Sequence, residues 1–522
     1  MKKGKIIWKI ISKVLLVFIF FMLIFMLRSA DWFLNNFNEV DFSVAMYQLF
    51  SPLKGTETSV LQDYVNQCLY PSVFFALSSV VVYTFCDMMS GRLFLELNLR
   101  IGAIKCLCGG GQNRRTAGRK KIIVLWCVIS ILCLCVWNKA SEVGIPEYVE
   151  SVSNVSGIFE AEYISPDSVS VTFPSKKRNL IVIYMESMET TYASVEAGGG
   201  KQVNYIPELT RLAGEHISFS NCGGLGGAAG AAETGWTMGG LFASATGVPY
   251  KLPVDGNNAG EYENFAPGLM GIGEVLLENG YKNYFMCGSE AAFGGRKAFY
   301  EQHGDYCVLD YSSAKAVGII PEDYHVFWGM EDEKLYTFAK QKLTEIAEQD
   351  EPFNFMMLTV DTHPADGYIC GLCNEVYESP YENVLACASR QVGEFVDWAG
   401  RQEWYENTTI VITGDHLSMK ADFWDDIGDY ERKIYNCFIN LPNGISKEHI
   451  ANREFSILDM FPTMLAAVGA DIEGNRLALG TNLFSGVRTL PEQMGFKEFN
   501  NELKLYSNYY YMNFIVGDKL QI

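Results

Sequence analysis

NLIVIYMES, residues 179–187, is an apolar, β-rich run that ends in a carboxylate, Glu186. Three later runs follow the same plan: residues 283–296 end at Arg296, residues 353–363 at His363, and residues 407–416 at Asp415 and His416. Because helix-length segments separate the runs, they predict buried parallel strands of a doubly wound α/β sheet. Ligands of such sheets bind beyond the carboxyl ends of the strands. We therefore expect these side chains to meet at one edge, in a site for a metal and a phosphate.

The first third of the chain differs from the rest because it contains long apolar segments. Residues 6–27, 70–89 and 122–137 predict three membrane helices, and the first is too long for a signal peptide and lacks a small-residue cleavage site. Basic residues precede the first span and fill the segment between the second and third, which predicts cytoplasmic loops. Everything after about Asn138 is then expected outside the cytoplasm. The alternative for the basic cluster 114–121, a nucleic-acid patch, is less consistent with its place between two spans.

The net charge of −20 lies mostly on the part expected to be exported. An acidic surface disfavours nucleic acid as a partner, and an anionic substrate would need a local cation to approach it. A bound metal ion would supply that cation.

Cys370 and Cys373 form a CxxC motif, which is compatible with zinc or redox chemistry. No second CxxC and no His pair with zinc-finger spacing accompanies it. We therefore favour a loop disulfide, such as Cys373 with Cys387, and assign the motif no catalytic role.

Glu186, Asp415 and His416 offer oxygen and nitrogen ligands that suit a divalent cation. Each has a simpler interpretation when taken alone, since Glu186 could cap the next helix and an Asp-His pair occurs in many loops. Their shared position at strand ends favours the metal site.

The glycine-rich segment 223–249 predicts a loop that leads into a helix, with Thr234 and Thr237 near the helix start. A hydroxyl at that position can be activated by a cation and by the helix amino terminus, which also favours phosphate oxygens. The alternative is that Thr234 only caps the helix. Local sequence leaves these two interpretations equally open.

The chain resembles the membrane-anchored phosphoglycerol transferases of the alkaline phosphatase and sulfatase superfamily, which include lipoteichoic acid synthase and the enzyme acting on osmoregulated periplasmic glucans. The stretches that carry the resemblance are NLIVIYMESMETTY, TGWTMGGLFASATGVP, GSEAAFGGRKAFYEQHG, LTVDTHPADGY, VITGDHLSM, FSILDMFPTML and LALGTNLFSG, in order across residues 175–490. The glucan enzyme is the nearer likeness. The sulfatase nucleophile signature C/S-x-P-x-R is absent from the sequence, which disfavours sulfate ester hydrolysis.

The resemblance implies a site and a reaction. Glu186, Thr234, Asp415 and His416 would bind one divalent cation, Mn²⁺ in such enzymes, with Thr234 as nucleophile and Thr237 as the fallback. Arg296 and His363 would hold the substrate. The reaction would move phosphoglycerol from phosphatidylglycerol to a glycan or polyglycerophosphate acceptor through a covalent threonine intermediate, releasing diacylglycerol.

The expected organisation is a membrane anchor (1–138), an extracytoplasmic linker (139–174), a sulfatase-like catalytic domain with a mixed, mostly parallel sheet flanked by helices (175–490), and a tail packed on that domain (491–522). Partners would be the bilayer, the lipid donor and the acceptor, without nucleic acid. The alternatives are a phosphoethanolamine transferase, a phosphodiesterase, or a non-catalytic envelope-binding protein.

Overall fold

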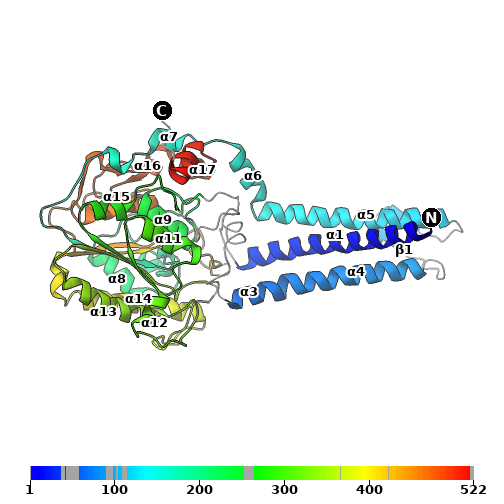
Figure 1. Ribbon diagram of the computed structural model, residues 1–522, viewed down its shortest axis with the longest axis horizontal. Coiled ribbons are helices and arrows are strands. Elements are labelled where there is room, and N and C mark those ends of the chain that lie inside the picture. Colours follow the sequence, from blue (N-terminus) through cyan, green and yellow to red (C-terminus); the bar gives the residue numbers. More distant parts are fainter. Residues whose placement is uncertain are drawn as a thin grey trace. The chain divides into compact units, whose positions relative to one another are not determined.

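The computed structural model describes residues 2–36, 42, 58–89, 98–101, 104–107, 114–251, 264–364, 366–420 and 423–517 (Figure 1). The chain divides into two compact units. One comprises residues 1–35 and 58–146, and the other comprises residues 36–57 and 147–522.

The larger unit is built on a six-stranded sheet in the order β6-β5-β7-β4-β8-β9. Its strands are β4 (Asn179–Met185), β5 (Lys282–Cys287), β6 (Cys307–Leu309), β7 (Phe353–Leu358), β8 (Thr408–Gly414) and β9 (Asn436–Ile439). All neighbours pair in parallel except β8 and β9, which are antiparallel. The predicted mixed, mostly parallel sheet is confirmed, and the four quoted runs supply its four adjacent strands β5, β7, β4 and β8.

Helices cover both faces of this sheet, as Figure 1 shows. Alternate residues of β4 divide between two cores: Leu180 and Val182 belong to one, and Ile181 and Ile183 to the other. The first core is completed by α9 (Thr237–Thr246), α10 (Ile272–Glu278), α11 (Arg296–Gln302) and α15 (Met460–Ala467), and the second by α8 (Pro207–Glu215), α12 (Tyr311–Ala316), α13 (Asp332–Ala347) and α14 (Pro380–Ala399). A strand that is apolar on both sides is what burial between two helical layers requires.

Short elements close the unit at its periphery. They are α6 (Ile145–Ser153), α7 (Ile158–Glu162), α16 (Leu490–Met494), α17 (Phe496–Lys504), α18 (Asn508–Tyr510), β3 (Val171–Thr172), β10 (Asp471–Ile472), β11 (Arg476–Leu477) and β12 (Gly480–Thr481). The ring of Phe159 in α7 packs edge-on against Tyr510 and Phe514. The segments before and after the sheet-forming region therefore pack together on one core.

The smaller unit consists of long helices. α1 (Lys2–Asn36), α4 (Tyr70–Met89) and α5 (Arg114–Glu142) are its main helices, with α3 (Thr58–Tyr64), a π-helical turn at Val65–Leu69, and the hairpin of β1 (Asn98–Ile101) and β2 (Ile104–Leu107). Leu16 and Phe20 of α1 pack with Ala76 of α4 and with Leu125 and Ile129 of α5. The three helices thus form one small bundle.

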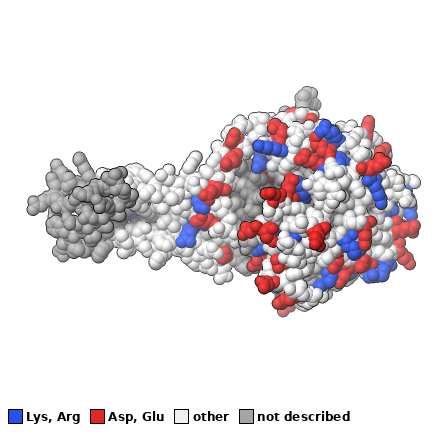
Figure 2. Space-filling model, turned by 180° about the vertical axis from the view of Figure 1, so that it is seen from behind, with Lys and Arg blue, Asp and Glu red and all other residues white. Residues whose placement is uncertain are grey.

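Two of these helices are long and apolar enough to cross a membrane, Ile11–Asn36 and Ile123–Glu142, among the residues that the structure describes. They coincide with the first and third predicted spans. α4 is a helix at the position of the second predicted span, but its role as a span remains a prediction. Figure 2 shows mixed acidic and basic side chains across the visible face of the larger unit, whereas the described bundle surface is mostly uncharged.

Candidate metal centre and active site

The carboxyl ends of β4 and β8 bring Glu186, Asp415 and His416 together. The two strands pair in register up to Met185 opposite Gly414, so the residues that follow each strand leave the sheet at the same point. All three side chains are buried. The predicted meeting of these groups at one sheet edge is therefore seen in the structure.

The turn after β4 fixes the first ligand. Ser187 adopts a left-handed backbone conformation, with φ 53°, which is uncommon for a residue other than glycine. Its backbone N–H donates to Asp415 Oδ1 at 2.8 Å, and its hydroxyl donates to Glu186 Oε1 at 2.9 Å. One turn residue therefore orients the carboxylates that come from two different strands.

The donor atoms face one another at distances suited to a shared cation. His416 Nε2 lies 3.3 Å from Glu186 Oε1 and 3.4 Å from Asp415 Oδ2. Because His416 Nδ1 donates to the Leu417 carbonyl at 2.7 Å, Nε2 carries the free lone pair of the neutral ring. Bonds of about 2.1 Å to one ion would separate neighbouring ligand atoms by about 3.0–3.4 Å.

Two of these atoms are buried without a hydrogen-bond partner, namely Asp415 Oδ2 and His416 Nε2. A buried polar atom without a partner costs about 1–3 kcal/mol, and a metal ion would satisfy both atoms together. Two carboxylates and one imidazole are also the ligand types that Mn²⁺ and Zn²⁺ accept. The residues present therefore fit a divalent cation.

The pKa values of the cluster express the same demand for positive charge. Burial and the neighbouring Glu186 raise the pKa of Asp415 to about 8. Burial also opposes the charged forms of Glu186 and His416. The Asp415 and Glu186 carboxylates nevertheless raise the pKa of His416 to about 9. In turn, His416 lowers the pKa of Glu186 to about 2. Without a metal, the cluster therefore keeps a bound proton that offsets the charge of its carboxylates. Binding a metal ion would release this proton.

The two candidate nucleophiles occupy different positions at the start of α9. Thr237, the first residue of the helix, donates from its hydroxyl to Glu186 Oε2 at 3.1 Å. Thr234 is buried three residues earlier, and its hydroxyl donates to the Ala231 carbonyl at 2.8 Å. The structure thus brings Thr237 into direct contact with Glu186, a candidate metal ligand.

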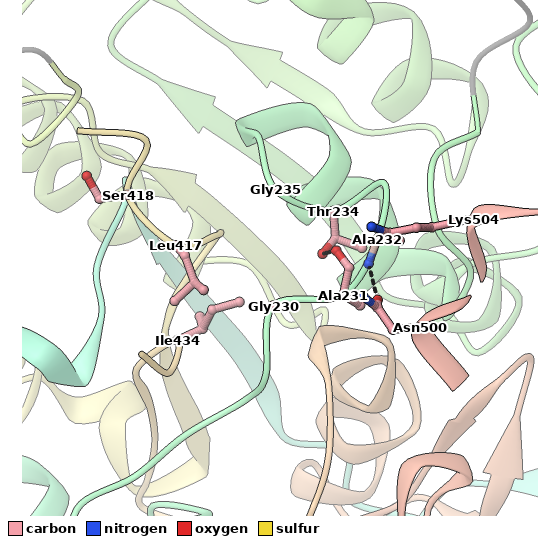
Figure 3. A pocket seen from close by; sticks show the side chains of 10 residues that line it. All are labelled: Gly230, Ala231, Ala232, Thr234, Gly235, Leu417, Ser418, Ile434, Asn500 and Lys504. Carbon is pink, nitrogen blue, oxygen red and sulfur yellow. Dashed lines mark hydrogen bonds between the residues drawn. The ribbon is translucent and has the colours of Figure 1, made fainter. Parts of the chain in front are cut away.

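Thr234 instead lines a pocket of about 160 Å³, which Figure 3 shows from close by. Leu417 and Ser418 bound the pocket on one side, and Asn500 and Lys504 of α17 bound it on the other. A larger pocket of about 510 Å³ shares Gly230 and Leu417 with it and is lined by aromatic and charged side chains: Trp424, Tyr430, Glu431, Arg432, Lys433 and Phe496. The two pockets are therefore neighbours, and Thr234 lines only the smaller one.

Close approach of α9 to the metal ligands depends on Gly240. A Cβ atom at this position would lie 2.0 Å from the Asp415 carbonyl oxygen. Only glycine lets the helix backbone come this near to the end of β8.

Arg296 opens α11, directly after a left-handed turn at Gly294 and Gly295. Its Nη2 donates to Ser289 Oγ and to the Glu290 carbonyl, both at 2.9 Å, whereas its buried Nε has no hydrogen-bond partner. The guanidinium is thereby held in place through Nη2, and its buried Nε–H is left unpaired.

His363 lies in the loop after β7, with its ring 4.8 Å from that of Trp328. Its Nδ1 donates to the Pro364 carbonyl at 2.7 Å, which leaves Nε2 as an acceptor. Burial lowers the pKa of His363, while the Glu186 carboxylate opposes that shift and Arg296 adds to it. His363, Arg296 and Glu186 therefore share one electrostatic neighbourhood.

The sequence did not single out several residues that support this site. The Glu186 backbone N–H donates to Thr359 Oγ1 at 3.0 Å, and Thr362 Oγ1 donates to the Glu186 carbonyl. Both threonines stand in the quoted segment 353–363, where a threonine two residues before Asp361 and another directly after it were the available signal. The role of Ser187 could not be predicted from its residue type, because it depends on the backbone N–H and on a left-handed backbone conformation.

Fold and site together define an α/β protein with a candidate metal centre at the carboxyl edge of its sheet. The sequence model of the sulfatase family matches residues 178–470, more than half of the chain, and the chain belongs to this family. The match contains the metal cluster, both threonines, Arg296 and His363.

Curated relatives carry a more specific name. Phosphoglycerol transferase I of Escherichia coli (strain SMS-3-5 / SECEC) and of Citrobacter koseri are each 30% identical over 334 residues, which is 63% of this chain. That alignment spans 41% of the length of these relatives.

One solved structure agrees at the level of the fold, and a second is reported beside it. The lipooligosaccharide phosphoethanolamine transferase A (EptA), an integral membrane protein from Neisseria meningitidis, matches 88% of this chain and 84% of its own, with a TM-score of 0.50 and 14% identity. The lipoteichoic acid synthase LtaP from Listeria monocytogenes matches 60% of this chain and 79% of its own, with a TM-score of 0.43 and 20% identity.

Proposed function

We propose that this protein is a membrane-bound phosphoglycerol transferase. It would move phosphoglycerol from phosphatidylglycerol to a glycan or glycerophosphate-polymer acceptor and release diacylglycerol. The observation that carries the proposal is the buried cluster of Glu186, Asp415 and His416, which the Thr237 hydroxyl contacts at the start of α9. Thr234 lies three residues before that helix. The name of the curated relatives supports the choice of phosphoglycerol as the transferred group.

One divalent cation, Mn²⁺ in our proposal, would be held by Glu186, Asp415, His416 and Thr234. When bound, it would lower the pKa of a hydroxyl and neutralise charge on phosphoryl oxygens. The Thr234 oxygen attacks phosphorus and the P–O bond to diacylglycerol breaks. The proton given up by the Thr234 hydroxyl passes through His363 to the departing diacylglycerol oxygen, and a glycerophosphothreonine forms. An acceptor hydroxyl then displaces the threonine oxygen and takes the phosphoglycerol group.

Arg296 and His363 have separate duties in this scheme. Arg296 stabilises negative charge on the nonbridging oxygens, because its guanidinium is buried and held by Ser289. His363, neutral and with Nε2 free to accept, takes the proton of the entering hydroxyl in the second step and returns protons to leaving oxygens.

The two neighbouring pockets suggest the path of the acceptor. Thr234 lines the smaller one, and the larger one offers the rings of Trp424, Tyr430 and Phe496. Aromatic rings can bury the apolar faces of sugars, and the neighbouring charged groups can bond hydroxyls. We propose that a glycan acceptor enters here.

The proposed organisation follows the expected segments: an anchor of three spans in residues 1–138, a linker at 139–174, a catalytic domain at 175–490 and a tail at 491–522. The amino terminus would lie in the cytoplasm and the catalytic domain on the extracytoplasmic side. An anchor of this kind keeps the site near its lipid donor.

The deciding experiment incubates the purified, detergent-solubilised protein with Mn²⁺ and phosphatidylglycerol labelled in its terminal glycerol, beside Thr234→Ala and Thr237→Ala. Diacylglycerol release by wild type and Thr237→Ala but not by Thr234→Ala supports the proposal. Loss only in Thr237→Ala would make Thr237, the residue in contact with Glu186, the nucleophile. Release only from phosphatidylethanolamine would favour phosphoethanolamine transfer, and label appearing only as free glycerophosphate in the presence of acceptor would favour a phosphodiesterase.

A further inference from the structure

Three cysteines gather outside the site described above. Cys370 and Cys373 lie in the loop between β7 and α14, and Cys387 lies in α14. Cys370 Sγ is 3.7 Å from Cys373 Sγ and 3.8 Å from Cys387 Sγ, and all three sulfurs lie within 4.8 Å of one another. All three are free thiols, so the predicted disulfide of Cys373 with Cys387 is wrong for this structure.

We propose that Cys370, Cys373 and Cys387 form a second metal site that takes Zn²⁺ through three thiolates. A tetrahedral zinc ion has Zn–S bonds of about 2.3 Å, which places neighbouring sulfurs about 3.8 Å apart. The two measured separations from Cys370 match that spacing. A disulfide would need sulfurs about 2.05 Å apart and would leave the third thiol without a role.

Donors around the sulfurs support thiolate character. Gln391, buried in α14, directs its Nε2 toward Cys387 Sγ at 3.4 Å and Cys370 Sγ at 3.9 Å. Arg390 Nη2 contacts Cys387 Sγ at 3.5 Å. Such N–H donors are the outer partners that orient thiolate ligands and balance their charge.

The burial pattern leaves one coordination position open. Cys370 and Cys387 are buried, whereas Cys373 is partly exposed. Three thiolates would supply three of the four ligands of a tetrahedral zinc ion, and a water molecule would supply the fourth, since the partial exposure of Cys373 brings solvent near the cluster.

This site would hold the loop that carries His363. Within that loop the Tyr368 backbone N–H donates to the Asp361 carbonyl at 2.8 Å, and Tyr381 of α14 donates from its hydroxyl to the Thr362 carbonyl at 3.1 Å. The first contact closes the beginning of the loop on itself, and the second fixes it to α14. A zinc ion would fix its distal part to the same helix, so its removal should loosen His363 without touching the catalytic ligands.

The test measures metal content in a background without the catalytic centre. The full-length Asp415→Asn protein is purified in detergent with reductant and without chelator, then compared with Asp415→Asn/Cys373→Ser and with the control Asp415→Asn/Cys307→Ser, which removes an exposed cysteine elsewhere. We expect about one zinc per chain in the first and third proteins, and a loss of at least fivefold in the second. Elemental analysis for zinc, copper and manganese gives the readout.

Two further measurements keep the proposal testable if Cys373→Ser fails to fold. Cobalt substitution in Asp415→Asn should give the visible and near-ultraviolet bands of a tetrahedral thiolate site, and a mercurial thiol reagent should release the zinc. Absence of zinc and of these cobalt bands would overturn the proposal, as would a mass-mapped disulfide among the three cysteines in protein purified without reductant. None of these readouts depends on the proposed transferase activity.

Discussion

Asp415 has separate tasks for its two carboxylate oxygens. Oδ1 accepts the backbone N–H groups of Ser187 and His416, each at 2.8 Å, and so braces the turns after both strands. Oδ2 faces the shared donor cluster and has no hydrogen bond. A substitution that keeps the hydrogen bonds of Oδ1 but removes the ligand atom Oδ2 would separate the effect on folding from the effect on metal binding.

Asp415→Asn is that substitution. Its amide oxygen can replace Oδ1, while its NH₂ group cannot ligate a cation. We expect the thermal midpoint to stay within a few degrees and the bound manganese to fall by tenfold or more, measured by differential scanning fluorimetry and elemental analysis. The exposed Asp397→Asn serves as the control and should keep its metal. Full metal occupancy in Asp415→Asn would remove Asp415 from the ligand set.

The role proposed for His363 predicts that activity falls on the acidic side of the pH profile, which we call the acid limb. Burial lowers its pKa below the ordinary value of about 6.5, so the ring is neutral at pH 7 and becomes charged only in more acidic solution. As a base it works in the neutral form, so kcat/KM should fall as pH drops below about 6.5. Because the unfolded chain binds this proton more readily, the same group makes folding stability fall in that direction.

Comparing wild type with His363→Gln isolates this limb. The variant should lose at least a hundredfold in kcat/KM and should no longer show the limb that His363 causes. An unchanged pH profile would assign the acid limb to other groups and leave His363 with a binding role only.

At the scale of elements, the active site depends on how close α9 comes to the end of β8. Gly240 makes this approach possible, because an added Cβ would meet the Asp415 carbonyl at 2.0 Å. Backbone, unlike a flexible side chain, cannot move aside cheaply at such a contact.

Gly240→Ala should therefore displace α9 and disturb the metal ligands together. We expect a loss of about 1–3 kcal/mol in the free energy of unfolding, with reduced metal content, since overpacking of this kind costs that much. Gly214→Ala in α8 is the matched control, because nothing lies within 4 Å of its Cβ position and alanine favours a helix. Equal midpoints for the two variants in chemical denaturation would contradict the close contact.

The elements also explain what could be predicted from sequence. The runs around Glu186 and Asp415 were recognisable because a parallel strand buried on both faces must be apolar throughout, and its polar residues then gather at its end. The contact of Thr237 with Glu186 was not predictable, since it depends on where α9 sits. The left-handed conformation of Ser187 and the distances among the three thiols likewise arise from packing, which residue spacing does not encode.

At the scale of the whole molecule, the chain joins two kinds of surface. The bundle exposes large apolar side chains around its helices, among them Phe74 at 66%, Trp126 at 65% and Leu134 at 68%. A helix that is apolar on its outward faces is typical of a lipid environment. The larger unit instead keeps its apolar residues in the two layers beside the sheet.

The apolar surface of the bundle makes the topology of the chain testable. Three spans with a cytoplasmic amino terminus would place the carboxyl terminus outside, because each span reverses the side of the chain. An epitope tag after Ile522 should therefore be digested by protease added to intact spheroplasts, whereas the same tag before Met1 should be protected until the cells are lysed. If α4 did not cross, two spans would leave both tags on the same side and both protected. That result would put the proposed catalytic domain in the cytoplasm, away from extracytoplasmic acceptors, and would overturn the proposed orientation.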